Sequence, residues 1–175
     1  MDKIRLKDGR IATVEFLKKD ADPKEYLRFI NKLIEERSYI LMDKKATLKE
    51  EKEWVKRNAE ALKKKTGYTL SARVDGKLAG NSDATKGKYK EKDNVSLGIA
   101  LAKEYRGLGL GERLLKLNIK YAKKMFRPRN IYLTVFSTNK RAHAVYKKVG
   151  FREIARLPKW INHYGKYVDL LIMKL

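Results

Sequence analysis

The sequence predicts one α/β domain over residues 1–175, in which helices cover the faces of a mixed β-sheet. Two observations carry this prediction. Stretches in which apolar residues alternate, as in half-buried strands, are interspersed with stretches in which they recur at helical spacing. The chain also has no repeat, low-complexity tract or linker that would divide it. With 175 residues, 43% of them hydrophobic, it is long enough to bury one core.

The first half of the chain predicts two strands, two helices and a hairpin. Asp8-Gly9 and Asp75-Gly76 are preferred dipeptides of tight hairpin turns. Thr47 and Glu50 have the spacing of a capping box at the start of the second helix. The predicted elements are the strands 2–7 and 10–17, the helices 24–37 and 48–65, and the hairpin 68–84.

The second half predicts strands that alternate with two helices, and then two closing strands. Pro128 ends the first of these helices, and Gly150 suits a left-handed cap at the end of the second. The predicted elements are the strand 94–102, the helix 110–126, the strand 130–136, the helix 138–150, and the strands 151–157 and 167–175.

Composition excludes several classes of site. The chain has no cysteine, so a disulfide framework, a thiolate nucleophile and a cysteine-based zinc site are ruled out. Its two histidines are too few for a histidine-rich site, and we expect no bound metal. No apolar run approaches the roughly 18 residues of a membrane span, and the charged N-terminus lacks the apolar core of a signal peptide. We therefore expect a soluble, cytoplasmic protein.

The net charge is +22, from 43 Lys and Arg against 21 Asp and Glu. A Lys-rich composition without glutamine is typical of thermophile proteins, so heat adaptation explains part of the charge density. Heat adaptation does not explain the sign of the charge. A positive surplus of this size attracts polyanions such as CoA, nucleotides, RNA or acidic proteins, and composition alone does not choose among them.

The stretch KEYRGLGLGERLL, residues 103–115, places three glycines between a predicted strand and a predicted helix. The free N–H groups of a helix N-terminus form a natural phosphate site, which small residues leave open. The stretch lacks the Gly-Lys-Ser/Thr of a P-loop, and Glu112 stands where a G-x-G-x-x-G fingerprint needs its last glycine. It matches R-x-x-G-x-G through Arg106, Gly109 and Gly111. The alternative is a plain tight turn into the helix.

A second motif lies in STNKRAHAVYKKVGF, residues 137–151. Asn139, Ala142, Tyr146 and Gly150-Phe151 follow the pattern N-x-x-A-x-x-x-Y-x-x-x-G-F. Together the two motifs resemble those of the GNAT superfamily of acetyl-CoA-dependent N-acetyltransferases. The resemblance is good over residues 68–175, and before residue 68 it rests on the order of the elements alone. The resemblance implies the GNAT fold, a mixed and mostly antiparallel twisted sheet, flanked by helices on both faces, whose strands splay at the acetyl-CoA site.

The resemblance also implies that backbone groups hold the cosubstrate, acetyl-CoA. Main-chain groups of one strand would meet the pantetheine arm, the glycine-loop amides would hold the pyrophosphate, and an arginine and an asparagine would add contacts. Glu112, in the first helical turn, suits the helix dipole and would point away from the phosphates. The implied residues are Ile99, Ala100, Leu101, Arg106, Gly107, Leu108, Gly109, Leu110, Gly111, Glu112, Asn139 and Tyr146.

Tyr146 matches the family tyrosine beside the thioester sulfur. In the implied reaction an amine attacks the thioester directly, and a phenol can protonate the departing thiolate. The alternative is a core tyrosine on an apolar helix face. The family places a glutamate base where this chain has Thr134, or near Val95 and Ser96. No general base is therefore assigned.

The resemblance places the acceptor amine beside residues 37–47 and a predicted loop at 158–167. Tyr39, Trp160 and Tyr164 are the candidate substrate-side residues, although such aromatics can equally cap the edge of the core. The acceptor would be a protein N-terminus, a lysine, or a small amine or amino acid. The rival function is a basic nucleic-acid- or ribosome-associated protein that keeps the fold without catalysis. The oligomeric state stays open, with a dimer among the alternatives.

Overall fold

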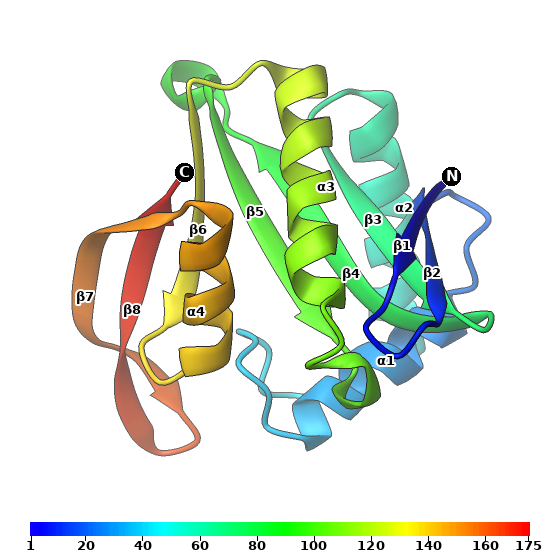
Figure 1. The fold of residues 1–175 in the computed structure, drawn as a ribbon, viewed down its shortest axis with the longest axis horizontal. Coiled ribbons are helices and arrows are strands. Elements are labelled where there is room, and N and C mark those ends of the chain that lie inside the picture. The colour runs from blue at the N-terminus through cyan, green and yellow to red at the C-terminus, as the bar shows by residue number, and fades with distance from the viewer.

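A computed structural model of the protein describes residues 1–175 (Figure 1). The strands are β1 (Asp2–Arg5), β2 (Ile11–Phe16), β3 (Gly67–Val74), β4 (Lys77–Lys86), β5 (Asn94–Leu101), β6 (Asn130–Phe136), β7 (Arg152–His163) and β8 (Lys166–Lys174). The helices are α1 (Pro23–Glu35), α2 (Leu48–Lys63), α3 (Leu110–Phe126) and α4 (Lys140–Val149), with short 3₁₀ turns at Tyr89–Glu91 and Lys103–Tyr105. None of the helices combines the length and the apolar character that crossing a membrane requires.

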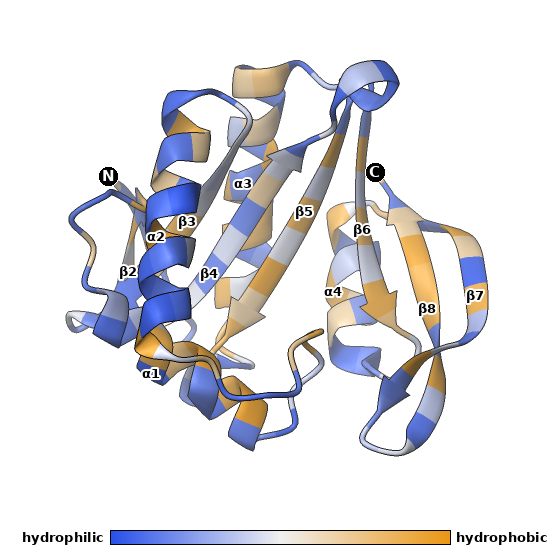
Figure 2. Cartoon of the chain, turned by 180° about the vertical axis from the view of Figure 1, so that it is seen from behind, coloured by the Kyte–Doolittle hydropathy of each residue, from blue (hydrophilic) through white to orange (hydrophobic).

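All eight strands form one sheet in the order β1-β2-β3-β4-β5-β6-β8-β7. Every neighbouring pair is antiparallel except β5 and β6, which run parallel and are connected through α3. The helices α3 and α4 cover one face of the sheet, and α1 and α2 cover the other (Figures 1 and 2). The predicted fold class, a mostly antiparallel mixed sheet between two helical layers, is therefore confirmed.

Three of the four helices begin at a side chain that caps them. Asp22 caps α1, the predicted Thr47–Glu50 capping box starts α2, and Asn139 caps α4. The exception is α3, whose N-cap is Gly109 and which has no side-chain cap. An uncapped helix start leaves N–H groups without a protein partner, and these can bind a ligand.

A buried polar network fixes α3 on the sheet. The Tyr68 hydroxyl of β3 donates to Asn118 Oδ1 at 2.7 Å, and Asn118 Nδ2 donates to Ser82 Oγ at 2.7 Å and to the Asp83 carbonyl oxygen at 2.8 Å. Buried polar groups that satisfy one another in this way hold a single arrangement of their elements. The network therefore fixes α3 against β4 at Ser82 and Asp83.

The closing hairpin is longer than predicted, so the predicted loop at 158–167 is wrong. β7 continues to His163, which pairs with Lys166 of β8, and only Tyr164-Gly165 forms the turn. The ladder is interrupted between Leu157 and Ile161, around Pro158, which has no N–H to donate. This proline gave the stretch the composition of a loop, although β7 continues past it after an irregularity in which Lys159 has a φ of +51°.

Candidate active site

The candidate site centres on the opening between β5 and β6. These strands pair only where Asn94–Ser96 meet Asn130–Tyr132, and then they diverge (Figure 2). From Leu97 to Leu101 the β6-facing edge of β5 has no strand partner, while its other edge stays paired with β4. Ile99, Ala100 and Leu101 lie on this free edge. Unpaired main-chain groups on such an edge can bind an extended ligand as an added strand.

The glycine loop turns the chain from β5 into α3. Gly107 and Gly109 have φ of +85° and +81°, in the left-handed region that favours glycine. Gly111 meets a different requirement, because a Cβ there would lie 3.2 Å from Leu101 Cδ1. The first backbone bond of the helix runs from Arg113 N to Gly109 O. The amides between these two residues therefore keep no acceptor in the protein.

Two leucines anchor this loop. The carbonyl oxygen of Leu108 accepts a hydrogen bond from Lys7 N at 3.0 Å, which ties the loop to the turn between β1 and β2. Leu110, the first residue of α3, is fully buried in the core. Neither anchor uses the N–H of Leu110, Gly111 or Glu112, so these donors stay free.

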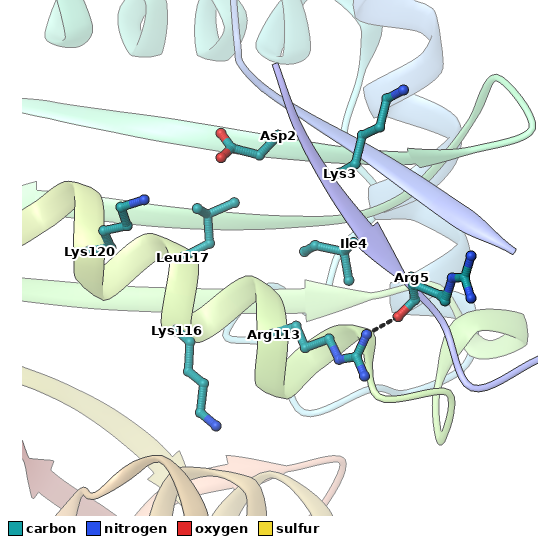
Figure 3. Close-up of a pocket in the computed structure, with 8 residues that line it drawn as sticks. All are labelled: Asp2, Lys3, Ile4, Arg5, Arg113, Lys116, Leu117 and Lys120. Atoms are coloured by element: carbon teal, nitrogen blue, oxygen red, sulfur yellow. Dashed lines mark hydrogen bonds between the residues drawn. The ribbon is translucent and has the colours of Figure 1, made fainter. Parts of the chain in front are cut away.

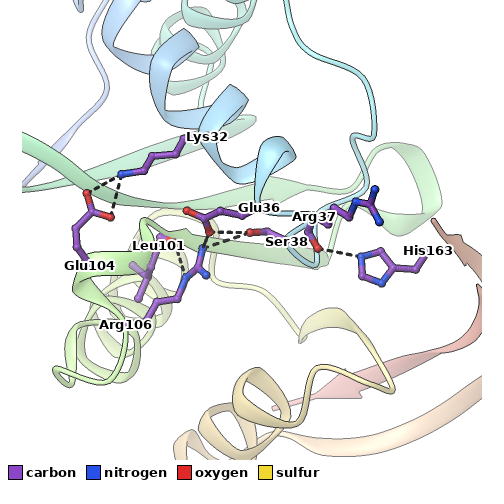
Figure 4. Close-up of polar contacts among 8 residues, drawn as sticks. All are labelled: Lys32, Glu36, Arg37, Ser38, Leu101, Glu104, Arg106 and His163. Carbon is purple, nitrogen blue, oxygen red and sulfur yellow. Dashed lines mark hydrogen bonds and ion pairs between the residues drawn. The ribbon is translucent and has the colours of Figure 1, made fainter.

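Arg106 is engaged by protein groups at the end of β5. Its guanidinium donates to Glu36 at 2.8 Å, to Ser38 Oγ at 3.3 Å and to the Leu101 carbonyl oxygen at 3.0 Å (Figure 4). These bonds tie the end of α1 to the end of β5, and the carboxylate of Glu36 balances the arginine charge. The observed contacts make Arg106 a positioning residue, and its predicted contact with acetyl-CoA stays a prediction.

The carboxylate of Glu112 is bound by two lysines. Its oxygens lie 2.8 Å from Lys116 Nζ and 2.7 Å from Lys148 Nζ. These hydrogen bonds lower the pKa of Glu112 to about 2. Since Lys148 belongs to α4, Glu112 links the start of α3 to the helix on the other side of the opening.

Tyr146 and Asn139 are the two candidate site residues of α4. The Tyr146 side chain is 7% exposed and packs near Phe151. Burial, and the nearby charge of Asp83, raise the pKa of Tyr146 to about 12, and no hydrogen bond to its hydroxyl contributes to the shift. Asn139 Oδ1 caps α4 by accepting from Ala142 N at 3.2 Å, which leaves its Nδ2 group as the free donor.

The sequence analysis missed Asp83, which lies on β4 opposite Gly98 of β5. Burial raises the pKa of its carboxyl group to about 6. A Cβ on Gly98 would lie 2.5 Å from Asp83 Oδ1, so the carboxylate occupies the space that glycine leaves on β5. The available signal was an aspartate inside a predicted strand, where a charged residue is unusual.

Aromatic and polar contacts join the α1–α2 segment to the tip of the β7–β8 hairpin. The rings of Tyr39 and His163 are 5.1 Å apart. His163 Nε2 lies 3.2 Å from the Arg37 carbonyl oxygen (Figure 4). The Tyr164 hydroxyl donates to the end of α1, and its ring lies beside His163 and Arg37. Trp160 is 64% exposed and lies outside this cluster. The structure thus brings together two of the three predicted substrate-side residues.

A basic groove lies between β1 and α3 (Figure 3). Arg113 donates to the Arg5 carbonyl oxygen across it. Five of its eight lining side chains are cationic, which favours anions. They are Lys3, Arg5, Arg113, Lys116 and Lys120.

The profile of the Acetyltransferase (GNAT) family matches residues 28–151, more than half of the chain. The chain belongs to the GNAT acetyltransferase family. An N-alpha-acetyltransferase of Sulfurisphaera tokodaii is 38% identical over 71 residues, which cover 41% of this chain and 39% of that protein. The L-amino acid N-acetyltransferase AaaT of Escherichia coli is 30% identical over 105 residues, covering 59% of this chain and 65% of that protein. The matched stretch thus spans about two fifths of the first relative and just under two thirds of the second.

Solved structures agree with this GNAT assignment at the level of the fold. The putative acetyltransferase yncA of Salmonella typhimurium, solved with its cofactor acetyl-CoA, has a TM-score of 0.81 and 20% identity, over 94% of this chain and 92% of that one. The residues present here fit acetyl-CoA. The uncapped amides before Arg113 suit a pyrophosphate, and the free edge of β5 suits an extended arm. No group of three or more His, Asp or Glu side chains is placed to hold a metal ion.

Proposed function

We propose that the protein transfers the acetyl group of acetyl-CoA to a primary amine, namely the α-amino group of a polypeptide N-terminus or of an amino acid. One observation carries the proposal. The free edge of β5 leads directly into the uncapped start of α3, and the buried phenol of Tyr146 on α4 is near enough to Asp83 for its charge to raise the phenol pKa. A strand edge, a set of phosphate donors and a phenol are the groups that a CoA thioester requires.

Each of these groups has one task. The amides from Gly107 to Glu112 bind the pyrophosphate, and the helix dipole favours its charge. The edge from Ile99 to Leu101 pairs with the arm, and Asn139 Nδ2 donates a hydrogen bond to it. When bound, acetyl-CoA supplies an acyl carbon that an amine can attack directly.

Tyr146 is the proton donor to the thioester sulfur of acetyl-CoA. Because its pKa is about 12, the phenol keeps its proton at neutral pH and is a hydrogen-bond donor throughout the reaction. The bond that it donates strengthens as negative charge develops on the departing sulfur, since charge-assisted hydrogen bonds are stronger than neutral ones. The proton then passes to the sulfur when the carbon–sulfur bond breaks.

The acceptor side favours an amine that enters end-on. Tyr39 and Tyr164 each contact His163 between the α1–α2 segment and the hairpin tip, and these contacts support an acceptor that enters by its end rather than one that passes through. A net charge of +22 also disfavours polyamines, which carry several positive charges. The two relatives above, an N-alpha-acetyltransferase and an L-amino acid N-acetyltransferase, carry names of this acceptor class, whereas two other relatives are named for spermine.

The test is an acceptor screen that follows release of CoA thiol. The panel contains free amino acids, peptides with a free N-terminus, N-terminally blocked peptides with an internal lysine, and spermine. We expect acetylation of free α-amino groups, confirmed by the mass of the product. Faster acetylation of the blocked lysine peptide or of spermine would overturn the proposed acceptor class.

A second candidate property is association with nucleic acid. The observation that favours it is the groove of Figure 3, whose five cations lie outside the acetyl-CoA opening. Both properties can reside in one protein, because the groove and the opening are lined by different residues.

A further inference from the structure

Asp83 and the opening between β5 and β6 lie side by side. Asp83 pairs with Gly98, two residues beyond the last β5–β6 pair at Ser96. The Asp83 carboxylate extends over the Gly98 backbone, where a Cβ would lie 2.5 Å from Oδ1 and 3.0 Å from Oδ2. The absence of a side chain at Gly98 therefore lets an acid from β4 reach the border of the opening.

The carboxylate belongs to the face of the sheet that the acceptor would approach. Asp83 pairs with Thr69, whose hydroxyl donates to Asn58 of α2, so both side chains lie on the α1–α2 face. The neighbouring Ser82 bonds Asn118 of α3 on the opposite face. On the same face as Asp83, Asn81 Oδ1 is buried without a partner. This part of β4 thus offers acceptors that the protein itself does not satisfy.

No cation neutralises Asp83. No side chain donates a hydrogen bond to its carboxylate, and its raised pKa has burial as the main cause, opposed only by its own backbone N–H. The titratable groups that feel its charge are the phenols of Tyr68 on β3 and Tyr146 on α4. From α2 the polar group on this face is the uncharged Asn58, which bonds Thr69 beside Asp83, and β5 presents only Gly98. The Asn118 amide of α3 binds only the main-chain carbonyl of Asp83, from the opposite face. The carboxylate is therefore available to an incoming cation.

We propose that Asp83 is the group that accepts a proton from the acceptor ammonium, an inference that rests on the proposed acetyl transfer. An ammonium carries three protons and the amide product carries one. Asp83 takes the first proton, which frees the nitrogen lone pair to form the carbon–nitrogen bond. The second proton leaves the nitrogen and reaches the sulfur through the Tyr146 hydroxyl as the carbon–sulfur bond breaks. Asp83 then returns its proton to solvent.

The first experiment titrates Asp83 in the protein without ligands, by NMR of carbon-13-labelled aspartate carboxyl groups. Asp83→Asn assigns the signal. We expect a titration near pH 6, because burial disfavours the charged carboxylate. Since this pKa lies above the ordinary value of about 3.9, the folded state loses stability as the pH rises from one value to the other. Asp83→Asn should therefore raise Tm over wild type at about pH 8 but not at about pH 4. A titration near the ordinary value would overturn the proposal.

The second experiment measures kcat/KM against pH for wild type, Asp83→Asn, Gly98→Ala and Asp93→Asn, with a peptide that has a free N-terminus. Asp93 is exposed in the turn just before β5, so Asp93→Asn makes the same charge change away from the opening. We expect kcat/KM of Asp83→Asn to be roughly tenfold or more below that of wild type at neutral pH. The wild-type rate should fall as the pH drops below about 6, and the variant should not show this fall. Gly98→Ala keeps Asp83 but displaces its carboxylate, and should lose activity as well. Asp93→Asn should match wild type.

The outcomes separate this inference from the proposed function. If wild type acetylates the peptide and Asp83→Asn keeps its rate and pH profile, Asp83 is not the proton acceptor and the acetyl transfer stands. If wild type acetylates no amine in the acceptor screen, the proposed function fails, and the role of Asp83 fails with it.

Discussion

At the scale of single residues, the surroundings of Tyr146 and Asp83 set the pKa values of these two groups. Tyr146 and Asp83 lie within electrostatic range of one another, and burial raises the pKa of both groups. The phenol keeps its proton at neutral pH, whereas a carboxyl group with a pKa of about 6 has released its own. One group is therefore poised to donate and the other to accept, which is the division of labour that acid–base catalysis needs.

Tyr146→Phe tests the donor. The substitution removes the hydroxyl and keeps the ring that packs near Phe151. We expect acetyl-CoA affinity to stay the same and turnover to fall by at least about tenfold, because the departing sulfur then has no proton donor. Calorimetry measures the affinity and CoA release measures the turnover. Unchanged turnover would leave Tyr146 as a core residue only.

At the scale of elements, the start of α3 differs from the other helix starts in having no side-chain cap. The other three helices carry a capping side chain, whereas α3 begins at Gly109 without one. Missing caps commonly cost about 1 kcal/mol of stability. A ligand that binds the free amides offsets this cost, so binding and stability are coupled here.

Gly111→Val tests this helix start as a phosphate site. We expect acetyl-CoA binding to be abolished, because a branched side chain there stands among the free amides and also presses on Leu101. Calorimetric titration at moderate salt measures the binding, with ATP as the control for non-specific anion binding. Equal and weak binding of both ligands to wild type would mean that the loop is only a turn.

A double variant separates the two effects of the valine. Leu101→Ala removes the side chain that a Cβ on Gly111 would meet at 3.2 Å. Adding it to Gly111→Val should therefore recover thermal stability without recovering acetyl-CoA binding. Recovery of both properties would assign the binding defect to packing against Leu101 instead of to the ligand.

At the scale of the whole molecule, the charge of +22 has no explanation in the acetyl-CoA site alone. Five of the cations line the groove between β1 and α3 (Figure 3). A groove of this kind binds phosphate backbones with an affinity that falls as salt rises, because bound cations are released from the nucleic acid.

Charge-neutralising variants test the groove. Lys3→Gln with Lys120→Gln should weaken binding to a single-stranded RNA and reduce the slope of log affinity against log salt by about 1.4, because each phosphate that a lysine neutralises contributes about 0.7 to that slope. Lys63→Gln with Lys64→Gln makes the same charge change at the exposed end of α2 and should have a smaller effect. Equal effects of the two pairs, or no binding at about 0.1 M salt, would exclude the groove as a specific surface.

Local patterns in the sequence were sufficient for the order of the elements and for most of their ends. Caps such as Thr47–Glu50 act within one helical turn, so their residues are neighbours in the chain. The closing hairpin was the exception, because Pro158 resembles a loop residue although β7 continues past it. The glycine loop and the α4 motif were readable for the same local reason.

The sequence by itself determined the family, the glycine loop that leads into a helix, and the positions of Gly109, Gly111, Asn139 and Tyr146. Only the tertiary structure decided what faces them. Asp83 meets Gly98 because the register of β4 on β5 aligns them, and Arg106 meets Glu36 because α1 ends beside β5. Register and helix placement depend on the packing of the whole core, so no short stretch of sequence contains them.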